Sequence, residues 1–506
     1  MNAQKLLKAT VAASTLCMLV FLYLFLSRNA PGLTAFPTVA TLAGIYGLVY
    51  LVAVAHWIVE GEKPAARRLL GGVTVIFSSV LLVYVFLEST VLDYYQPLSL
   101  YDDVIAALAL WWGLLIIVGV VSLLAARPML PLLARVFLLA LFAWPLAASL
   151  WWINSPEPGS KVLAHEHVFV GGQDGYDIYR IPGLVLIPAG SRLANGDVLS
   201  SDRLLAFAEA RRDGALDSGV IDLVLKTSDD DGQSWSRQAI ICQHQINQRR
   251  GKCGNPTPVF DTDSGTLVLA YNLSGLEVDN RWHSSHVMSS DDGGLNWGEA
   301  SFIADDNFVF GPGKGIRKVH PPHQGRLLLP GYTGGTAYLI YSDDHGGSWQ
   351  RSVGVDGGNE TDVAERPDGS LYLATRHNAP IARAPEPNGR LYSTSSDGAT
   401  NWSDLVIDQQ LPTPVCQASV ISTSGGSLLF SNPAHHSSRV RMTLRQSRDG
   451  GGSWDKGQLV YPGPSGYSVL AQGSDGSIYL LYENGNMAYS ERISLARVAP
   501  GKASPN

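Results

Sequence analysis

The chain has 506 residues, which is enough for two or more domains, and its formal net charge at pH 7 is −7. That acidic balance argues against nucleic acid as a partner, because binding nucleic acid needs a basic face. Four cysteines are too few for a disulfide scaffold, and no His/Cys cluster has zinc-site spacing, so neither a metal nor an organic cofactor is expected.

Residues 1–153 are dominated by Leu, Val, Ala and aromatic side chains. They contain five apolar stretches, each near the roughly 20 residues that a helix needs to span a bilayer. These stretches lie at about 7–27, 38–59, 69–88, 104–125 and 133–153. The first alone could be a signal peptide, but four more follow it without a soluble interlude. We therefore predict an α-helical multi-pass transmembrane region that contacts the lipid bilayer, because the backbone inside a membrane must satisfy its own hydrogen bonds.

Basic residues predict the orientation of these spans. They concentrate before the first span and in alternate connections, at Lys5, Lys8, Lys63, Arg67, Arg68, Arg127 and Arg135. The opposite connections hold only Arg28 and a later acidic set. With five spans, the N-terminus is expected in the cytoplasm and the chain after Trp152 outside it, either periplasmic or at the cell surface. Residues 154–162 are interpreted as a polar linker.

The rest of the chain carries an internal repeat, Ser-x-Asp-x-Gly-x-x-Trp. Copies lie at 228–235, 290–297, 342–349 and 447–454, and a degenerate copy at 395–402 has Ala399 in place of Gly. The Asp positions are 62, 52, 53 and 52 residues apart, in the range of a four-stranded propeller blade. Ser and Asp can cap turn groups and Gly can supply positive φ, so the motif is interpreted as structural. The period predicts an all-β six-bladed β-propeller over 163–497, followed by a tail at 498–506.

The repeat is similar to the Asp box, or BNR repeat, and Tyr179-Arg180-Ile181-Pro182 resembles the Arg-Ile-Pro signature of the sialidase (neuraminidase) superfamily. The resemblance extends over nearly all of about 163–497 and keeps the family's order of motifs. It implies a glycosidase that acts on sialylated glycoconjugates. Because Asp boxes also occur in non-catalytic propellers, the decision rests on the residues between them.

Sialic acid carries a carboxylate on its anomeric carbon, which favours arginine as a bidentate and permanently charged partner. The family uses three such arginines, and the resemblance assigns these roles to Arg180, to Arg376 in Leu-Ala-Thr-Arg, and to Arg439. Arg441, two residues further on, shares the strand face of Arg439 by alternation and stays open as the third arginine. Glu483 matches the family glutamate that holds the first arginine.

Sialidases use a tyrosine nucleophile, an exception among glycosidases. A neutral phenol is not repelled by the substrate carboxylate, provided that a base removes its proton as the bond forms. Tyr467 matches this nucleophile and Glu360 matches its base. Glu365 competes with Glu360, but an odd separation of five residues in a strand points it to the opposite face.

The acid/base of the family lies on a loop shortly before the first Asp box, which is where Asp217 occurs. Asp213 and Asp222 are rivals, although a loop position reaches over the substrate more easily than one within a strand. Arg211 and Asn255 are weaker candidates for substrate contact, and Asn-Pro is also a common turn signal.

Taken together, the resemblance implies an exo-α-sialidase with a retaining mechanism. Two alternatives stay open: a lectin-like propeller with weak or no turnover, and an enzyme that transfers sialic acid to another sugar. The joint presence of Asp217, Glu360 and Tyr467 argues against the lectin, since binding needs only the arginines. Cys242 and Cys253 could form a hairpin disulfide outside the cytoplasm.

Overall fold

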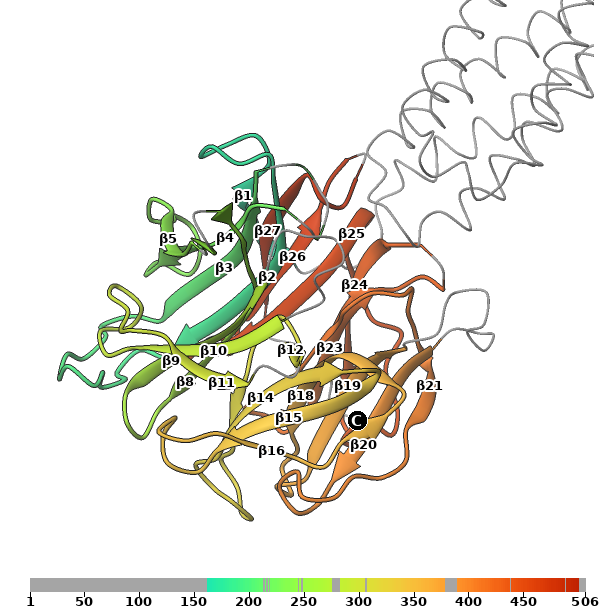
Figure 1. Ribbon diagram of the computed structural model, residues 1–506. Coiled ribbons are helices and arrows are strands. Elements are labelled where there is room, and N and C mark those ends of the chain that lie inside the picture. Colours follow the sequence, from blue (N-terminus) through green and yellow to red (C-terminus); the bar gives the residue numbers. More distant parts are fainter. Residues whose placement is uncertain are drawn as a thin grey trace, which may run out of the picture. The chain divides into compact units, whose positions relative to one another are not determined.

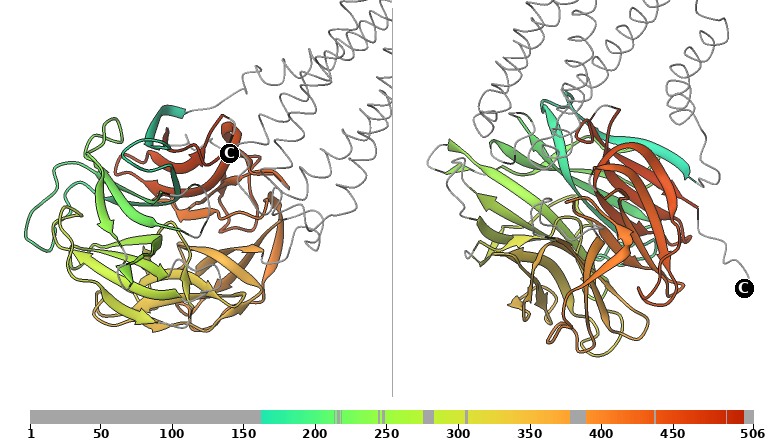
Figure 2. Two further views of the ribbon diagram at one scale, coloured as in Figure 1. Left: turned by 45° about the horizontal axis from the view of Figure 1, so that its top comes forward. Right: turned by 90° about the vertical axis from the view of Figure 1, so that its right-hand side faces the viewer.

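The computed structural model describes residues 162–499, apart from 213, 215–216, 218, 244, 247–248, 275–282, 305–306, 378–388, 437 and 487. Throughout this part of the chain the regular secondary structure is β-strand, with no helix. Its strands gather around a common centre in mainly antiparallel sheets, which Figure 1 and Figure 2 show from three directions; one parallel bridge, Ile221 with Lys252, links β4 (Ile221–Ser228) to β8 (Lys252–Asp261).

The fold class predicted from the sequence needs a correction. The described residues form an all-β fold, and none of them builds a helix long and apolar enough to cross a membrane. The expectation of a helical multi-pass region is therefore wrong for the fold that the structure establishes, and contact with a lipid bilayer through such helices is not supported. The five expected spans fall within 1–153, outside the described residues. The described residues instead carry short apolar runs separated by Asp-box turns, a pattern that builds strands and is too short for a spanning helix.

The strands form six antiparallel blades of four strand positions each within the described residues. Blade 1 consists of β2 (Ile178–Ile187), β3 (Arg203–Arg211), β4 (Ile221–Ser228) and β5 (Ala239–Cys242). Blade 2 consists of β8 (Lys252–Asp261), β9 (Thr266–Ser274), β10 (His283–Ser290) and β11 (Ser301–Ala304). Blade 3 has short inner strands β12 (Val309–Phe310) and β13 (Ile316–Arg317), then β14 (Leu327–Thr333), β15 (Thr336–Ser342), and the short outer strands β16 (Gln350–Arg351) and β17 (Val355–Asp356).

The other three blades follow the same plan. Blade 4 consists of β18 (Gly358–Glu365), β19 (Leu371–His377), β20 (Gly389–Ser395) and β21 (Val406–Pro412). Blade 5 consists of β22 (Ser419–Ser422), β23 (Leu428–Pro433), β24 (Val440–Ser447) and the first half of β25 (Gln458–Gln472). Blade 6 takes the second half of β25, then β26 (Ile478–Asn484), β27 (Arg492–Val498) and β1 (Val162–Val170). A small hairpin of β6 (Gln245–Ile246) and β7 (Arg249–Arg250) lies outside the blades.

The ring is closed by the two ends of the described chain. β1, the earliest strand, pairs with β27, the latest, in a register that runs from Val162 opposite Val498 to Val170 opposite Arg492. In Figure 1 the teal β1 lies beside the red β27. Blade 6 is thus built from both ends of the propeller sequence, so that no blade edge is left open at the junction.

Apolar side chains fill the spaces between neighbouring blades. Alternate residues of one strand face opposite ways, so a middle strand serves two interfaces. In β26, Tyr479 and Leu481 pack into the cluster between blades 6 and 1, whereas Ile478, Leu480 and Tyr482 pack into the cluster between blades 5 and 6. Six such clusters occur among the described residues, one for each junction of the ring.

Each Asp box forms the turn after the third strand of blades 1 to 5. In blade 2, Ser290 Oγ donates to Asp292 Oδ1 at 2.8 Å and accepts from Gly294 N at 2.8 Å. The same Ser–Asp contact recurs in the other four copies at 2.7–2.9 Å. The degenerate copy keeps the geometry at a cost, because Ala399 adopts a φ of 83° that favours glycine. The structural interpretation of the motif is confirmed.

Candidate active site

Four inner strands have an irregular register at the same end of the ring. The register shifts fall between Arg180 and Gly183 in β2, Gly254 and Thr257 in β8, Gly358 and Thr361 in β18, and Ser465 and Ser468 in β25. A β-bulge bends its strand and re-aims a side chain, and bulges are frequent next to active sites. Arg180, Asn255, Glu360 and Tyr467 lie at or within these bulges, whereas Asp217 lies on the loop between β3 and β4.

Arg180 is held by a buried carboxylate. Its Nε donates to Glu483 Oε1 at 3.0 Å and its Nη2 donates to Glu483 Oε2 at 3.2 Å. The backbone N–H groups of Ile181 and Tyr467 also donate to this carboxylate, at 2.9 and 3.1 Å. Ile181 has a φ of 55°, which a β-branched residue rarely adopts. Such a strained conformation persists only where the surrounding contacts stabilise it, as the hydrogen bond from Ile181 N to Glu483 does here. Glu483 therefore fixes the guanidinium of Arg180 and joins blade 6 to blade 1.

Tyr467, Glu360 and Arg376 form a triangle of interactions. The Tyr467 hydroxyl donates a hydrogen bond to Glu360 Oε1. Arg376 Nη1 lies 2.7 Å from Glu360 Oε2 and 3.4 Å from the Tyr467 hydroxyl. Burial and then the charge of Glu360 raise the pKa of Tyr467 well above its usual value, even though the nearby arginines act in the other direction. In the resting site Tyr467 is therefore a neutral phenol whose proton already points at a base.

Arg439 lies on the other side of Tyr467. Its Cζ is 5.5 Å from the centroid of the Tyr467 ring, and its Nη2 donates to Val415 O at 2.9 Å. The alternation that left Arg441 open does not hold, because the register shifts between Val440 and Met442 and Arg441 itself has a φ of 65°. The geometry thus brings Arg439, together with Arg180 and Arg376, against one tyrosine.

Asp217 is the most exposed of the predicted catalytic residues, with 78% of its side chain exposed. Its Oδ1 is 2.9 Å from Arg211 Nη2 and 3.8 Å from Arg180 Nη1. Arg211 is almost fully buried and also donates to Glu209 Oε2 at 2.7 Å, while Lys252 Nζ donates to Asp217 O at 3.4 Å. Arg211 is therefore positioned to hold Asp217 in place.

The charges around Asp217 dominate its ionisation. Partial desolvation acts to raise the pKa of Asp217, but Arg211, Arg180 and Lys252 outweigh it and hold the pKa well below its usual value. Asp217 is consequently a carboxylate in the ligand-free site. An anionic ligand that neutralises Arg180 would shift this pKa upward again.

The rival acid lies elsewhere. Asp222 Oδ2 accepts hydrogen bonds from the Tyr176 hydroxyl at 2.7 Å, from Arg212 Nη2 at 3.2 Å and from Gln243 Nε2 at 3.1 Å. These three hydrogen bonds hold Asp222, a residue of β4, in a structural network of blade 1 away from Tyr467. The other rival, Asp213, lies outside the described residues.

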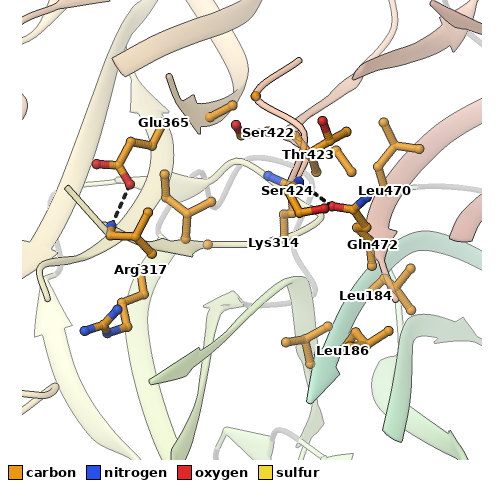
Figure 3. Close-up of a pocket in the computed structure, with 18 of the residues that line it drawn as sticks. Leu184, Leu186, Lys314, Arg317, Glu365, Ser422, Thr423, Ser424, Leu470 and Gln472 are labelled. Atoms are coloured by element: carbon orange, nitrogen blue, oxygen red, sulfur yellow. Dashed lines mark hydrogen bonds between the residues drawn. The ribbon is translucent and has the colours of Figure 1, made fainter. Parts of the chain in front are cut away.

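The rival base also lies away from Tyr467. Glu365 accepts hydrogen bonds from Lys318 Nζ at 2.7 Å and from Val319 N at 2.6 Å. It lines a separate cavity of about 600 Å³, formed by the C-terminal ends of inner strands, which Figure 3 shows with Glu365 beside the segment that carries Arg317. Glu360 and Glu365 thus have separate surroundings: Glu360 contacts Tyr467 and Arg376, whereas Glu365 lines this cavity.

Asn255 is engaged by protein groups. Its Nδ2 donates to Phe310 O at 3.0 Å and its backbone N donates to Glu209 Oε1 at 3.1 Å. A φ of 56° places it in the bulge of β8. The side chain therefore connects blades 2 and 3, and its contact with a substrate stays a prediction.

Sequence reasoning missed several residues of the site. Glu209 and Lys252 surround Arg211 and Asp217, and Tyr489 lies against Arg180. The spacing of Glu209 and Arg211, two residues apart on one strand, was a usable signal because such residues share a face. Tyr489 lies in the turn between β26 and β27, where no sequence motif points to it.

The arrangement as a whole favours a particular chemistry. Three guanidinium groups around one point can bind a carboxylate through several charge-assisted hydrogen bonds. Tyr467 with Glu360 provides a neutral nucleophile next to a base, and Asp217 provides an exposed carboxyl group. Such a site can bind an anionic ligand through the arginines while the nucleophile displaces a leaving group from a carbon next to the anion.

Residues 202–480 match the family model described as BNR repeat-like domain. A sialidase of Micromonospora viridifaciens is 30% identical over 377 residues, which cover 67% of this chain and 55% of that protein. A sialidase of Bacteroides fragilis is 26% identical over 355 residues, covering 62% of this chain and 61% of that protein. The chain therefore spans 55% and 61% of the length of these curated relatives.

Solved structures of similar architecture are also known. The Hadza microbial sialidase Hz136 has 26% sequence identity and a TM-score of 0.56, with 66% of this chain and 68% of that chain covered. An intramolecular trans-sialidase from Ruminococcus gnavus has a TM-score of 0.53, with 66% of this chain and 97% of that chain covered. At 18% identity the second likeness is one of fold alone.

Proposed function

This chain belongs to the sialidase (neuraminidase) superfamily, and we propose that it is an exo-α-sialidase that releases terminal α-linked sialic acid from glycoproteins, glycolipids or oligosaccharides. The observation that carries the proposal is the hydrogen-bonded pair of Tyr467 and Glu360 surrounded by three arginines. A site that only bound the sugar would need the arginines and no paired nucleophile and base.

In the proposed first step, the arginines bind the carboxylate of the sugar and Tyr467 attacks the anomeric carbon. The Tyr467 proton passes to Glu360 while the bond to the aglycone oxygen breaks, and Asp217 gives its proton to that oxygen. In the second step, Asp217 removes a proton from water, the water oxygen attacks the anomeric carbon, and Tyr467 leaves and recovers its proton from Glu360. Two displacements at one carbon retain its configuration.

The proposal needs Asp217 to be protonated when the substrate is bound. Arg211 and Arg180 keep it ionised in the free site. The substrate carboxylate neutralises part of this positive charge, so the pKa of Asp217 rises in the complex. Binding of the correct anionic sugar then prepares the acid for the first step.

The test is hydrolysis of a fluorogenic α-sialoside by the full chain and by Tyr467→Phe. We expect the substitution to lower kcat/KM by at least about 100-fold, because it removes the nucleophile and leaves the arginines in place. Tyr341→Phe is the matched control, since the Tyr341 hydroxyl donates to Gln350 on an exposed part of blade 3. Unchanged turnover in Tyr467→Phe would eliminate the assignment of the nucleophile.

The same assay separates the alternatives. A wild-type chain that binds sialic acid without releasing fluorophore would be a lectin-like propeller. Addition of lactose as an acceptor distinguishes transfer from hydrolysis, because a transferase forms sialyllactose where a hydrolase forms free sialic acid.

We also propose that the propeller works in an oxidising compartment outside the cytoplasm. Cys242 and Cys253 form a disulfide in the structure, and disulfides persist mainly in such compartments. Alkylation of the unfolded chain with and without prior reduction tests this: two additional reactive thiols after reduction support it, and equal thiol counts contradict it.

A further inference from the structure

The aromatic ring of Tyr489 lies between two of the three arginines. Its centroid is 5.2 Å from Arg180 Cζ and 5.0 Å from Arg439 Cζ. The ring of Tyr467 lies at similar distances, 5.3 Å from Arg180 and 5.5 Å from Arg439. Two guanidinium groups and two aromatic rings therefore form one contiguous cluster, although β2, β25, the residue just before β24 and the turn after β26 contribute to it.

The two arginines differ in how their charges are balanced. Arg180 has the carboxylate of Glu483 at 3.0 Å. For Arg439, the hydrogen bond to Val415 O and the two aromatic rings are the contacts seen in the described part of the chain, with no carboxylate at ion-pair distance. The negative face of an aromatic ring attracts a cation, most strongly where water is excluded. Tyr489 thus stabilises the cation that lacks a carboxylate and separates it from the neighbouring like charge.

The surrounding backbone is adapted to this ring. A Cβ on Gly466 would lie 2.9 Å from Tyr489 Cδ2 and 2.2 Å from Glu483 Oε2, so any larger residue would displace one of them. The turn that carries Tyr489 is held by Glu491, which accepts hydrogen bonds from Asn486 N at 2.9 Å and Ala488 N at 2.8 Å. Gly466 consequently leaves room for the ring, and Glu491 holds the turn that carries it.

We propose that Tyr489 is a positioning residue for carboxylate recognition, which holds Arg180 and Arg439 at the spacing that the carboxylate of the substrate requires. It acts through the face of its ring, and its hydroxyl is dispensable. This role rests on the proposed function, because it takes a carboxylate-bearing sugar as the ligand.

The experiment measures inhibition of the full chain by 2-deoxy-2,3-dehydro-N-acetylneuraminic acid and by its methyl ester. The acid presents the carboxylate and the ester removes its charge with little change in shape. The variants are Tyr489→Phe, which keeps the ring, and Tyr489→Leu, which removes it. Tyr489→Met serves as a second variant without a ring, because its flexible side chain fills irregular space if the leucine variant does not fold.

We expect Tyr489→Leu to weaken inhibition by the acid by about tenfold, as for the loss of two cation–π contacts, and to change inhibition by the ester by less than about twofold. Tyr489→Phe should behave like the wild type with both inhibitors. For the sialoside substrate, KM should rise more than kcat falls.

Two results would overturn this role: equal weakening of acid and ester in the ringless variants, or a phenylalanine variant as impaired as the leucine variant. Failure of the proposed function gives a different result. In that case the wild-type chain itself neither hydrolyses the sialoside nor prefers the acid to the ester.

Discussion

Replacement of Glu483 by glutamine changes one buried charge and leaves the shape of the side chain nearly the same. The carboxylate is inaccessible to solvent and accepts four hydrogen bonds, two from Arg180 and one each from Ile181 N and Tyr467 N. A glutamine side chain has one acceptor oxygen, so its amide nitrogen faces two donors that lose their acceptor. Arg180, which is 5% exposed, also loses its closest counter-charge.

Removal of one partner from a buried ion pair typically costs about 3–5 kcal/mol. The glutamine oxygen keeps part of the network, and Asp217 lies 3.8 Å from Arg180 Nη1, so we expect the lower end of this range. Glu483→Gln should therefore reduce the free energy of unfolding by about 3 kcal/mol. Since folded proteins are stable by about 5–15 kcal/mol, the variant should still fold at 25 °C.

The assay is urea unfolding of the full chain, followed by tryptophan fluorescence. Glu166→Gln is the matched control, because Glu166 is exposed on β1 and its replacement should change the free energy of unfolding by less than about 0.5 kcal/mol. A loss below about 1 kcal/mol in Glu483→Gln would refute the inference that this carboxylate balances Arg180 in a buried site.

Two further predictions concern pH and the disulfide. Because the substrate carboxylate neutralises Arg180 and so raises the pKa of Asp217, the acid stays protonated to higher pH in the complex than in the free enzyme. The descending limb of kcat against pH should therefore lie at higher pH than that of kcat/KM, and coincident limbs would contradict this coupling. Replacement of both Cys242 and Cys253 by serine should lower the free energy of unfolding by about 2–4 kcal/mol in the same urea assay, whereas a change within error would show that the bridge does not constrain the unfolded chain.

The extent to which the sequence predicted the site differs from residue to residue. Arg180, Glu360 and Tyr467 were found because each lies in a short segment that resembles a family motif, and the structure brings them together. Glu365 was separated from Glu360 by alternation along one strand, and the structure does give the two carboxylates different partners, although a register shift at Glu360 interrupts the strict alternation. The same rule failed for Arg439 and Arg441, because a register shift interrupts the alternation between them.

What the sequence determined by itself is the local architecture of the propeller. The Asp boxes fold as predicted because their Ser, Asp and Gly residues make their hydrogen bonds within about four positions of one another, as Ser290 does with Gly294. Their spacing then fixes the length of a blade. The apolar stretches of 1–153 carry no comparable side-chain chemistry, and the helical expectation drawn from them was overturned for the fold that is described.

Only the tertiary structure decided the interactions that join distant parts of the chain. The pairing of β1 with β27 closes the ring, and bulges in β2, β18 and β25 lie at Arg180, Glu360 and Tyr467, which contact one another in the site. Tyr489 meets Arg180 across more than 300 positions of sequence. Such contacts depend on the register and closure of the whole ring, and those are set by packing between blades, which no local pattern of residues records.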